Sequence, residues 1–343
     1  MRLIILSLYL FLSWNPEGKG QSSPSLFETL YGLEEVSITL TYPFDSLYRT
    51  NREEIDAIIS IESKEGILMK NEKITLNLRG KFRRMKCTMP PLLLNFKKST
   101  LRNLNLDNID EVKLVTHCLE TSEGEENLQE ELMCYQVYES LTPCSYRTIW
   151  LHVTYQDALQ PGKQIKSKGF LLEPDKDITK RLGFIERKLF NPAEDSIHFE
   201  SYSNAVAFNF LIGNRDWSII MSRNAKLFFD SISSHYVVIP YDFDYSNIVS
   251  ASYRRETRPD NMTHPLERIY QGEYFKNRSG EILKKFQESE DIILNRVATA
   301  PNPMDEKKKK KIAKYFETWF SQIKKMDAKD LPYGYLMNYK GGL

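Results

Sequence analysis

The sequence predicts an α+β fold in which a β-rich N-terminal half precedes a mostly helical C-terminal half. In the first half, segments such as "EEVSITLTYPF" at 34–44 alternate apolar and polar residues with the period of half-buried strands. In the second half, apolar residues recur mainly at helical spacing, and Asn, Pro and Gly separate the segments. We place the boundary between the halves at "EPDKD", residues 173–177.

The first residues predict a secretory signal peptide. One basic residue, Arg2, precedes an apolar run from Leu3 to Leu12, and small residues follow at Gly18 and Gly20. Because this run is too short for a membrane span, we expect cleavage after Gly20 and a mature protein that is secreted or held in a periplasm or cell envelope. An uncleaved anchor is the alternative. No later stretch is apolar enough to cross a bilayer, so we expect no membrane span after cleavage.

The N-terminal half is expected to form strands around one helix. The expected strands lie at 34–44, 72–82, 90–96, 110–118 and 146–157. Between the last two, apolar residues at helical spacing predict one amphipathic helix over 126–141 that crosses the sheet. The segment 168–183 predicts a strand, a turn at Pro174 and Asp175, and a short helix.

The C-terminal half is expected to be helical except for two strands. "SYSNAVAFNFLIGN" predicts a buried helix that ends near Gly213, and apolar strand-like segments follow up to residue 241. Three further segments have helical patterns, at 264–275, 279–297 and 305–326. The lysine run inside the last segment indicates a solvated helix face.

The charge balance names no partner. The chain has 47 Lys and Arg residues against 46 Asp and Glu residues, a formal net charge of +1. Since no overall positive field would recruit a polyanion, we expect neither nucleic acid nor an anionic membrane as a partner.

The four cysteines favour a disulfide over a metal site. They lack a CxxC spacing and a nearby pair of histidines, so structural zinc is not expected. Cys87 and Cys118 flank two neighbouring expected strands and are the first choice for a bridge, since a secreted protein can oxidise them. Cys134 falls in the helical pattern and is expected to be a buried thiol.

An unusual group of acids lies within otherwise apolar segments of the C-terminal half. Asp216, Asn224, Asp242 and Asp244 fall inside residues 212–249. Carboxylates in apolar surroundings are disfavoured unless they are paired, hydrogen-bonded or bound to a metal. Kinases place a loop Asp, a later Asn and an Asp at a strand end in this order, the first near the acceptor hydroxyl and the others on Mg²⁺. The order predicts phosphoryl transfer.

Two other interpretations of these acids stay open. Asp and Asn are common in turns, so each could cap a local element. A glycoside hydrolase could use Asp216 and Asp242 as paired carboxylates, although it would not require Asn224.

Four blocks together resemble the CotH-type protein kinases, a family named for a bacterial spore-coat protein and related to atypical secreted kinases. The blocks are "NLRGKFRRMKCTMPPLLLNFKK", "GFLLEPDKDITKRLG", "GNRDWSIIMSRNAKLFF" and "VVIPYDFDYS". The resemblance implies a two-lobed protein-kinase-like fold with a β-rich lobe over 21–175 and a helical lobe over 176–343 that carries the active-site strands. It also implies Mg²⁺-dependent transfer of phosphate from ATP or another nucleotide to a protein or glycan hydroxyl.

The resemblance also implies roles for the four acid-segment residues. Asp216 matches the catalytic Asp of the family. Asn224 and Asp242 match its metal-binding residues, and Asp244 is a second possible carboxylate ligand.

On the nucleotide side, the resemblance implies a set of charged residues from the N-terminal half. Glu173 would lie at the hinge and contact the nucleotide. Glu131 would pair with a lysine, and because Asn95 stands where a lysine is expected, Lys97 or Lys98 just after it would take that place. Arg79 opens a basic turn that could add positive charge near phosphates. A non-catalytic surface or envelope binding protein on the same scaffold is the alternative function, and a metal-assisted hydrolase is a third.

Overall fold

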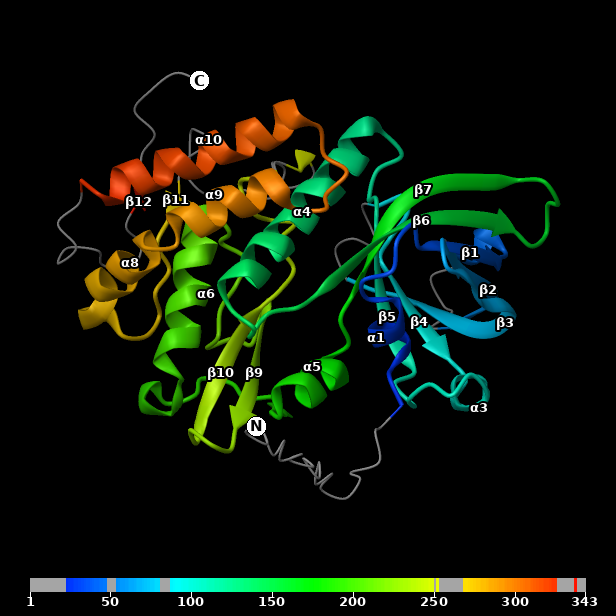
Figure 1. Cartoon of the computed structure of the whole chain (residues 1–343), viewed down its shortest axis with the longest axis horizontal. Coiled ribbons are helices and arrows are strands. Elements are labelled where there is room, and N and C mark those ends of the chain that lie inside the picture. Colours follow the sequence, from blue (N-terminus) through cyan, green and yellow to red (C-terminus); the bar gives the residue numbers. More distant parts are fainter. Residues whose placement is uncertain are drawn as a thin grey trace, which may run out of the picture.

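The computed structural model describes residues 23–47, 54–80, 87–249, 251–252, 268–325 and 336–337. The predicted signal peptide, residues 1–20, therefore lies outside the described residues. In Figure 1 the strands of the N-terminal half lie at the right and most of the helices at the left.

The strands of the N-terminal half form a closed barrel in the order β1-β2-β3-β4-β5-β7-β6. Its strands are β1 (Ser37–Tyr42), β2 (Ile55–Ser63), β3 (Gly66–Leu78), β4 (Leu92–Phe96), β5 (Glu111–Thr116), β6 (Thr148–Asp157) and β7 (Gln164–Leu172). Neighbours pair antiparallel except β1 and β6, which pair parallel and close the barrel. Three short helices contribute apolar side chains to its core: α1 (Leu26–Leu30), η1 (Phe44–Leu47) and α3 (Lys98–Asn103).

The barrel makes the predicted two-lobed protein-kinase-like fold wrong. A kinase-like N-terminal lobe has an open sheet, whereas here β6 pairs with β1 on one side and β7 on the other, which leaves the sheet without edges. The expected strands are all present, but the sequence did not predict β2, which joins β1 to β3. The alternation of apolar residues identifies a strand and its buried face, and it says nothing about which strand lies next to it.

The helix between β5 and β6 belongs to the helical part of the molecule. α4 (Ser122–Leu141) was expected to be amphipathic and to cross the sheet, yet every residue from 131 to 138 is buried. In Figure 1 it runs between the barrel and the C-terminal helices and packs along α9. Most of this helix is enclosed by its neighbours, and its exposed residues, such as Glu125 and Glu126, lie near its start, which is why its pattern is only partly amphipathic.

The C-terminal half follows its sequence pattern in most elements. α6 (Phe199–Ile212) ends at Gly213, whose φ of 65° is the left-handed geometry that glycine supplies at helix ends. β9 (Ala225–Asp230) and β10 (His235–Pro240) are the expected strands, and β8 (Ile185–Arg187) extends them to a three-stranded sheet. The remaining elements are α5 (Asp175–Leu182), η2 (Glu194–Ser196), η3 (Lys276–Arg278), α8 (Ser279–Gln287), α9 (Glu290–Thr299) and α10 (Glu306–Ile323).

The helix predicted over 264–275 is wrong. Residues 268 and 269 form strand β11 (Arg268–Ile269), which pairs with β12 (Leu336–Met337), and the described residues that follow up to 275 are not helical. Residues 264–267 lie outside the described residues. The Arg268 guanidinium is buried and donates to the carbonyl oxygens of Leu211 and Tyr315, so a tertiary contact holds this segment in place.

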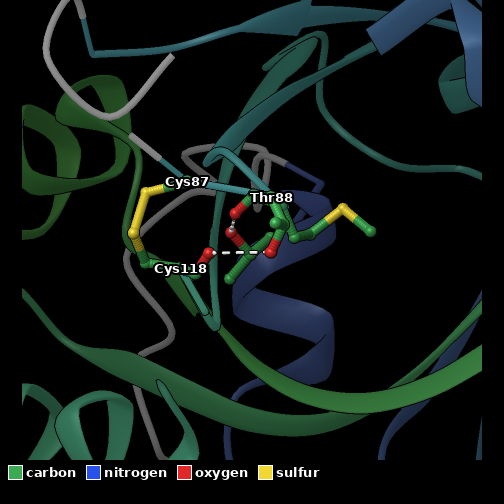
Figure 2. The surroundings of a disulfide bond; sticks show 5 residues. Cys87, Thr88 and Cys118 are labelled. Atoms are coloured by element: carbon green, nitrogen blue, oxygen red, sulfur yellow. Dashed lines mark hydrogen bonds between the residues drawn. A yellow bond between two sulfur atoms is a disulfide. The ribbon is translucent and has the colours of Figure 1, made fainter. Parts of the chain in front are cut away.

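The two cysteine predictions that the structure tests are confirmed. Cys87 and Cys118 form a disulfide, which ties the start of the β4 segment to the end of β5 (Figure 2). The backbone N–H and the hydroxyl of Thr88 both donate to the Cys118 carbonyl oxygen beside it. Cys134 is a buried free thiol.

No helix within the described residues has both the length and the apolar character needed to cross a bilayer.

Candidate functional site

Two lysines converge on one carboxylate between the barrel and the three-stranded sheet. Lys226 in β9 forms an ion pair with Asp175, the first residue of α5, and the Lys113 Nζ in β5 lies 3.5 Å from the same carboxylate oxygen. The Tyr146 hydroxyl donates to the other oxygen at 2.6 Å. Lys226 also pairs with Glu186 of β8 at 2.7 Å. We call Lys113, Tyr146, Asp175 and Lys226 the lysine cluster.

Strand alternation explains why both lysines point toward this place. Val112 and Leu114, on either side of Lys113, are buried inside the barrel, so the Lys113 side chain projects outward from it. Ala225 and Leu227 flank Lys226 in the same way and are buried in the C-terminal core. The outer face of one sheet thus meets the outer face of the other at the N-terminus of α5.

The lysine cluster perturbs the protonation of its members. Burial lowers the pKa of Lys113 to about 8, against the attraction of Asp175, and the positive charges of Arg79 and Lys226 lower it further. Burial alone would raise the pKa of Asp175, but Lys113 and Lys226 outweigh it and hold that pKa below its usual value. Burial lowers and Asp175 raises the pKa of Lys226, and the attraction prevails. Lys113 is therefore a desolvated cation with other cations close by, which is a setting that attracts anions.

The acid segment forms a second cluster, in which Asp216 and Asn224 are in contact. The Asn224 side-chain amide donates to the Asp216 carboxylate at 3.0 Å and to the Asp216 carbonyl oxygen. The Arg223 Nε lies 3.3 Å from the other carboxylate oxygen. Burial raises the pKa of Asp216, and the charge of Asp244 adds to this rise against the attraction of Arg223. A carboxylate with a raised pKa is a better proton acceptor than one with the usual pKa.

Asp242 and Asp244 come to this cluster from the end of β10. The Tyr241 N–H donates to the Asn224 carbonyl oxygen at 3.0 Å, and the Asp242 N–H donates to the Tyr135 hydroxyl at 2.8 Å. The φ angles of Asn224 and Asp242 are 50° and 61°, in the left-handed region that Asn and Asp tolerate better than most residues. We call Asp216, Asn224, Asp242 and Asp244 the acid cluster.

Tyr241 joins the two clusters. Its backbone is bonded to Asn224, and its ring centroid lies 5.8 Å from the Lys113 Nζ, which is also 5.6 Å from the Tyr146 ring centroid. Lys226 is two residues after Asn224 in the same chain segment. Cations and carboxylates from β5, α5, β9 and the end of β10 thus occupy one neighbourhood.

If Mg²⁺ binds near these residues, its protein ligands would come from the acid cluster. Among the described residues, no three His, Cys, Asp or Glu side chains are grouped so that they could hold a metal ion by themselves. Mg²⁺ is commonly bound by one or two carboxylates together with substrate phosphates and water. Asp242, Asp244 and the Asn224 amide oxygen supply the donor types for that kind of site.

Glu173 is used by the protein itself. Its side chain is fully buried and bonded to Arg147 and Arg181: Arg147 Nη2 lies 2.7 Å away, and Arg181 Nε and Nη2 each lie 2.9 Å away. Both guanidinium groups thus meet one carboxylate, which leaves it directed into the protein. The Glu173 side chain therefore does not face the candidate site, where the predicted nucleotide contact would lie.

The predicted pairing of Glu131 with Lys97 or Lys98 is not formed. Lys97 lies just before α3 and Lys98 pairs with Asp110 at 3.4 Å, while Glu131 is buried in α4. Figure 1 shows α3 and α4 well apart, at the outer rim of the barrel and among the helices. The chain turns away from the site after β4, so a lysine at its end cannot serve there.

The sequence patterns did not predict a site at the lysine cluster. A signal for it was present: Lys113 interrupts the apolar run "EVKLVT", and Lys226 does the same in "NAKLFF". Arg79, which was predicted, lies close enough to add to the lowering of the Lys113 pKa that burial causes. The basic residues that follow it at 81–86 lie outside the described residues.

Comparison with protein-family models gives no match for this chain, and comparison with curated proteins gives none either.

Proposed function

We propose that this protein transfers phosphate from ATP or another nucleotide to a hydroxyl group, with Mg²⁺ as cofactor. The observation that carries the proposal is the contact of the lysine cluster with the acid cluster through Tyr241. Phosphoryl transfer needs cations for the phosphate oxygens, oxygen ligands for Mg²⁺ and a carboxylate beside the acceptor hydroxyl. The resemblance of the acid segment to the CotH-type kinases supports the same chemistry, although the barrel is not a kinase-like lobe.

The residues of the two clusters would have different roles in the reaction. Lys113 and Lys226 would hold the phosphates, with Asp175 keeping both ammonium groups in place. Asp242, Asp244 and Asn224 would hold Mg²⁺, which supplies charge neutralisation at the phosphates when bound. The acceptor oxygen forms a bond to the terminal phosphorus, the bond to the leaving nucleoside diphosphate breaks, and Asp216 takes the hydroxyl proton.

The Cys87–Cys118 disulfide supports an exported protein, because such bonds persist in oxidising compartments. Secretion or residence in a periplasm or envelope, by way of a signal peptide over 1–20, is part of the proposal.

One observation favours the non-catalytic alternative. The Asp216 carboxylate contacts Arg223 and Asn224, and both contacts lower its pKa against the effect of burial, which makes it a weaker proton acceptor. A protein that binds the nucleotide without transferring phosphate would keep those contacts.

Thermal unfolding with and without ATP and Mg²⁺ tests binding, and transfer of labelled phosphate tests catalysis. Ligand at a hundred times its dissociation constant stabilises the folded state by about 2.7 kcal/mol. Asp216→Asn should keep this stabilisation and lose transfer, since a proton acceptor acts mainly in the transition state. Absence of any ATP-dependent stabilisation at millimolar concentration would contradict the proposal, and binding without transfer in the wild type would establish the non-catalytic alternative.

A further inference from the structure

The outer edge of β8 is a free strand edge next to the candidate site. β8 is the last strand of its sheet, and it has no second strand partner among the described residues. Ile185, Glu186, Arg187 and the following Lys188 are all exposed. An exposed edge presents backbone N–H and C=O groups that can pair with an extended peptide.

The segment that follows β8 lies against the turn between Asp216 and Asn224. The Asn191 N–H donates to the Ile220 carbonyl oxygen at 2.9 Å, and the Ser222 hydroxyl donates to the Leu189 carbonyl oxygen at 2.6 Å. A chain that pairs with β8 and continues in the same direction therefore passes beside the acid cluster.

The surface around this edge combines positive charge with apolar side chains. Arg187, Lys188 and Arg223 are exposed, and Phe190 and Met221 are 62% and 65% exposed. The single acid of the strand, Glu186, is paired with Lys226. We call residues 185–188, Phe190, Met221 and Arg223 the β8 surface.

We propose that the β8 surface docks an extended, acidic polypeptide as the phosphate acceptor, an inference that rests on the proposed function and narrows its acceptor from protein or glycan to protein. Acidic side chains of the acceptor meet Arg187, Lys188 and Arg223. An apolar side chain of the acceptor covers Phe190 and Met221. A glycan has no peptide backbone that could pair with a strand edge.

Direct binding of a labelled peptide tests the inference without relying on phosphate transfer. The probe is a fluorescein-labelled peptide of roughly ten residues, which spans ~33 Å when extended, with alternating Glu and Val around one Ser. A matched peptide with Lys in place of Glu and an acidic oligogalacturonate are the comparison ligands. Fluorescence anisotropy at low ionic strength gives the affinity, with competition by the unlabelled glycan.

Two variants locate the binding. The double variant Arg187→Glu, Lys188→Glu should weaken binding of the acidic peptide by about tenfold or more, and Phe190→Ser should weaken it by a few-fold. The matched control, Lys310→Glu with Lys314→Glu on the exposed face of α10, reverses the same charge elsewhere and should stay within about twofold. Circular dichroism confirms that each variant is folded.

The outcomes separate this inference from the proposed function. No measurable binding of the acidic peptide, equal affinity for the acidic and basic peptides, or equal loss in the α10 control would overturn the inference. Displacement of the bound peptide by oligogalacturonate at a lower concentration than by the unlabelled peptide would also overturn it, in favour of a glycan. Peptide binding that depends on Arg187 and Lys188 supports the docking surface. Stabilisation by ATP and Mg²⁺ is measured separately, so the nucleotide proposal can fail while the docking surface stands.

Discussion

Two carboxylates only two residues apart in the chain, Glu173 and Asp175, have opposite surroundings. The Glu173 side chain is fully buried and is held by two guanidinium groups. The Asp175 side chain is 18% exposed and meets two ammonium groups and a phenol. The first cluster has planar donors that match the carboxylate geometry, whereas the second has point charges that can also meet another anion. The comparison separates an ion cluster that holds the fold from one that can bind a ligand.

We predict the greatest loss of stability at Glu173, where two guanidinium groups meet one buried carboxylate. Glu173→Gln removes the buried charge that Arg147 and Arg181 share, so Arg181 loses this carboxylate and Arg147 keeps only its pair with the part-exposed Glu28. Breaking such a pair costs about 3–5 kcal/mol, and the urea midpoint of unfolding should fall accordingly. The matched change Asp175→Asn should cost about 1 kcal/mol, because the Asp175 side chain is 18% exposed whereas that of Glu173 is fully buried, and because Lys226 keeps Glu186 as a partner. Similar losses in both variants would erase the distinction between the clusters.

A second effect is expected on ligand binding, at the lysine cluster. Lys113→Met removes a cation that is costly to bury and keeps a side chain of similar length, so the free energy of unfolding should stay the same or rise slightly. Binding of ATP with Mg²⁺ should weaken by about a hundredfold, as expected for a buried charge-assisted contact to phosphate. Thermal unfolding across an ATP titration measures both quantities in one series. Lys64→Met, an exposed lysine of the barrel, is the control and should change neither.

The smallest effect is a pH dependence of stability and of ATP affinity that the titration of Lys113 causes. Its pKa of about 8 in the folded state lies below the value of 10.5 of an unperturbed lysine. Between these pH values the unfolded state binds more protons, so this residue makes the protein more stable as pH rises through that range. Over the same range the folded protein loses the positive charge, and ATP affinity should fall by roughly tenfold as pH rises through 8.

Lys113→Arg separates this effect from other titrations, because a guanidinium stays charged throughout. Isothermal titration calorimetry of ATP with Mg²⁺ at several pH values should show a fall in the wild type and a much flatter profile in the variant. Identical profiles would assign the pH dependence to another group.

Local patterns in the sequence predicted most elements but not their partners. The strands of the N-terminal half, the buried helix that ends at Gly213 and the Cys87–Cys118 disulfide follow from residue spacing, turn residues and strand order. The strand β2 was missed, and the helix over 264–275 was wrong, because β11 pairs with a strand about 70 residues further along the chain. Long-range pairing of this kind leaves no local signal.

The candidate site likewise has one part that local sequence predicts and one part that depends on long-range packing. Local sequence was enough to predict the acid cluster, because Asp216, Asn224 and Asp242 lie close in the chain and the β9–β10 hairpin brings Asp242 back beside Asn224. Which lysine lies near this cluster depends on how the whole chain is arranged in space. Lys97 and Lys98 lie just after Asn95, the position where the family resemblance predicts a lysine. In the closed barrel, however, β5 faces α5 and β9, and Lys113 on β5 reaches Asp175. Hydrogen bonds along neighbouring strands set where a side chain points, and the choice of neighbour depends on how the whole sheet buries its apolar face.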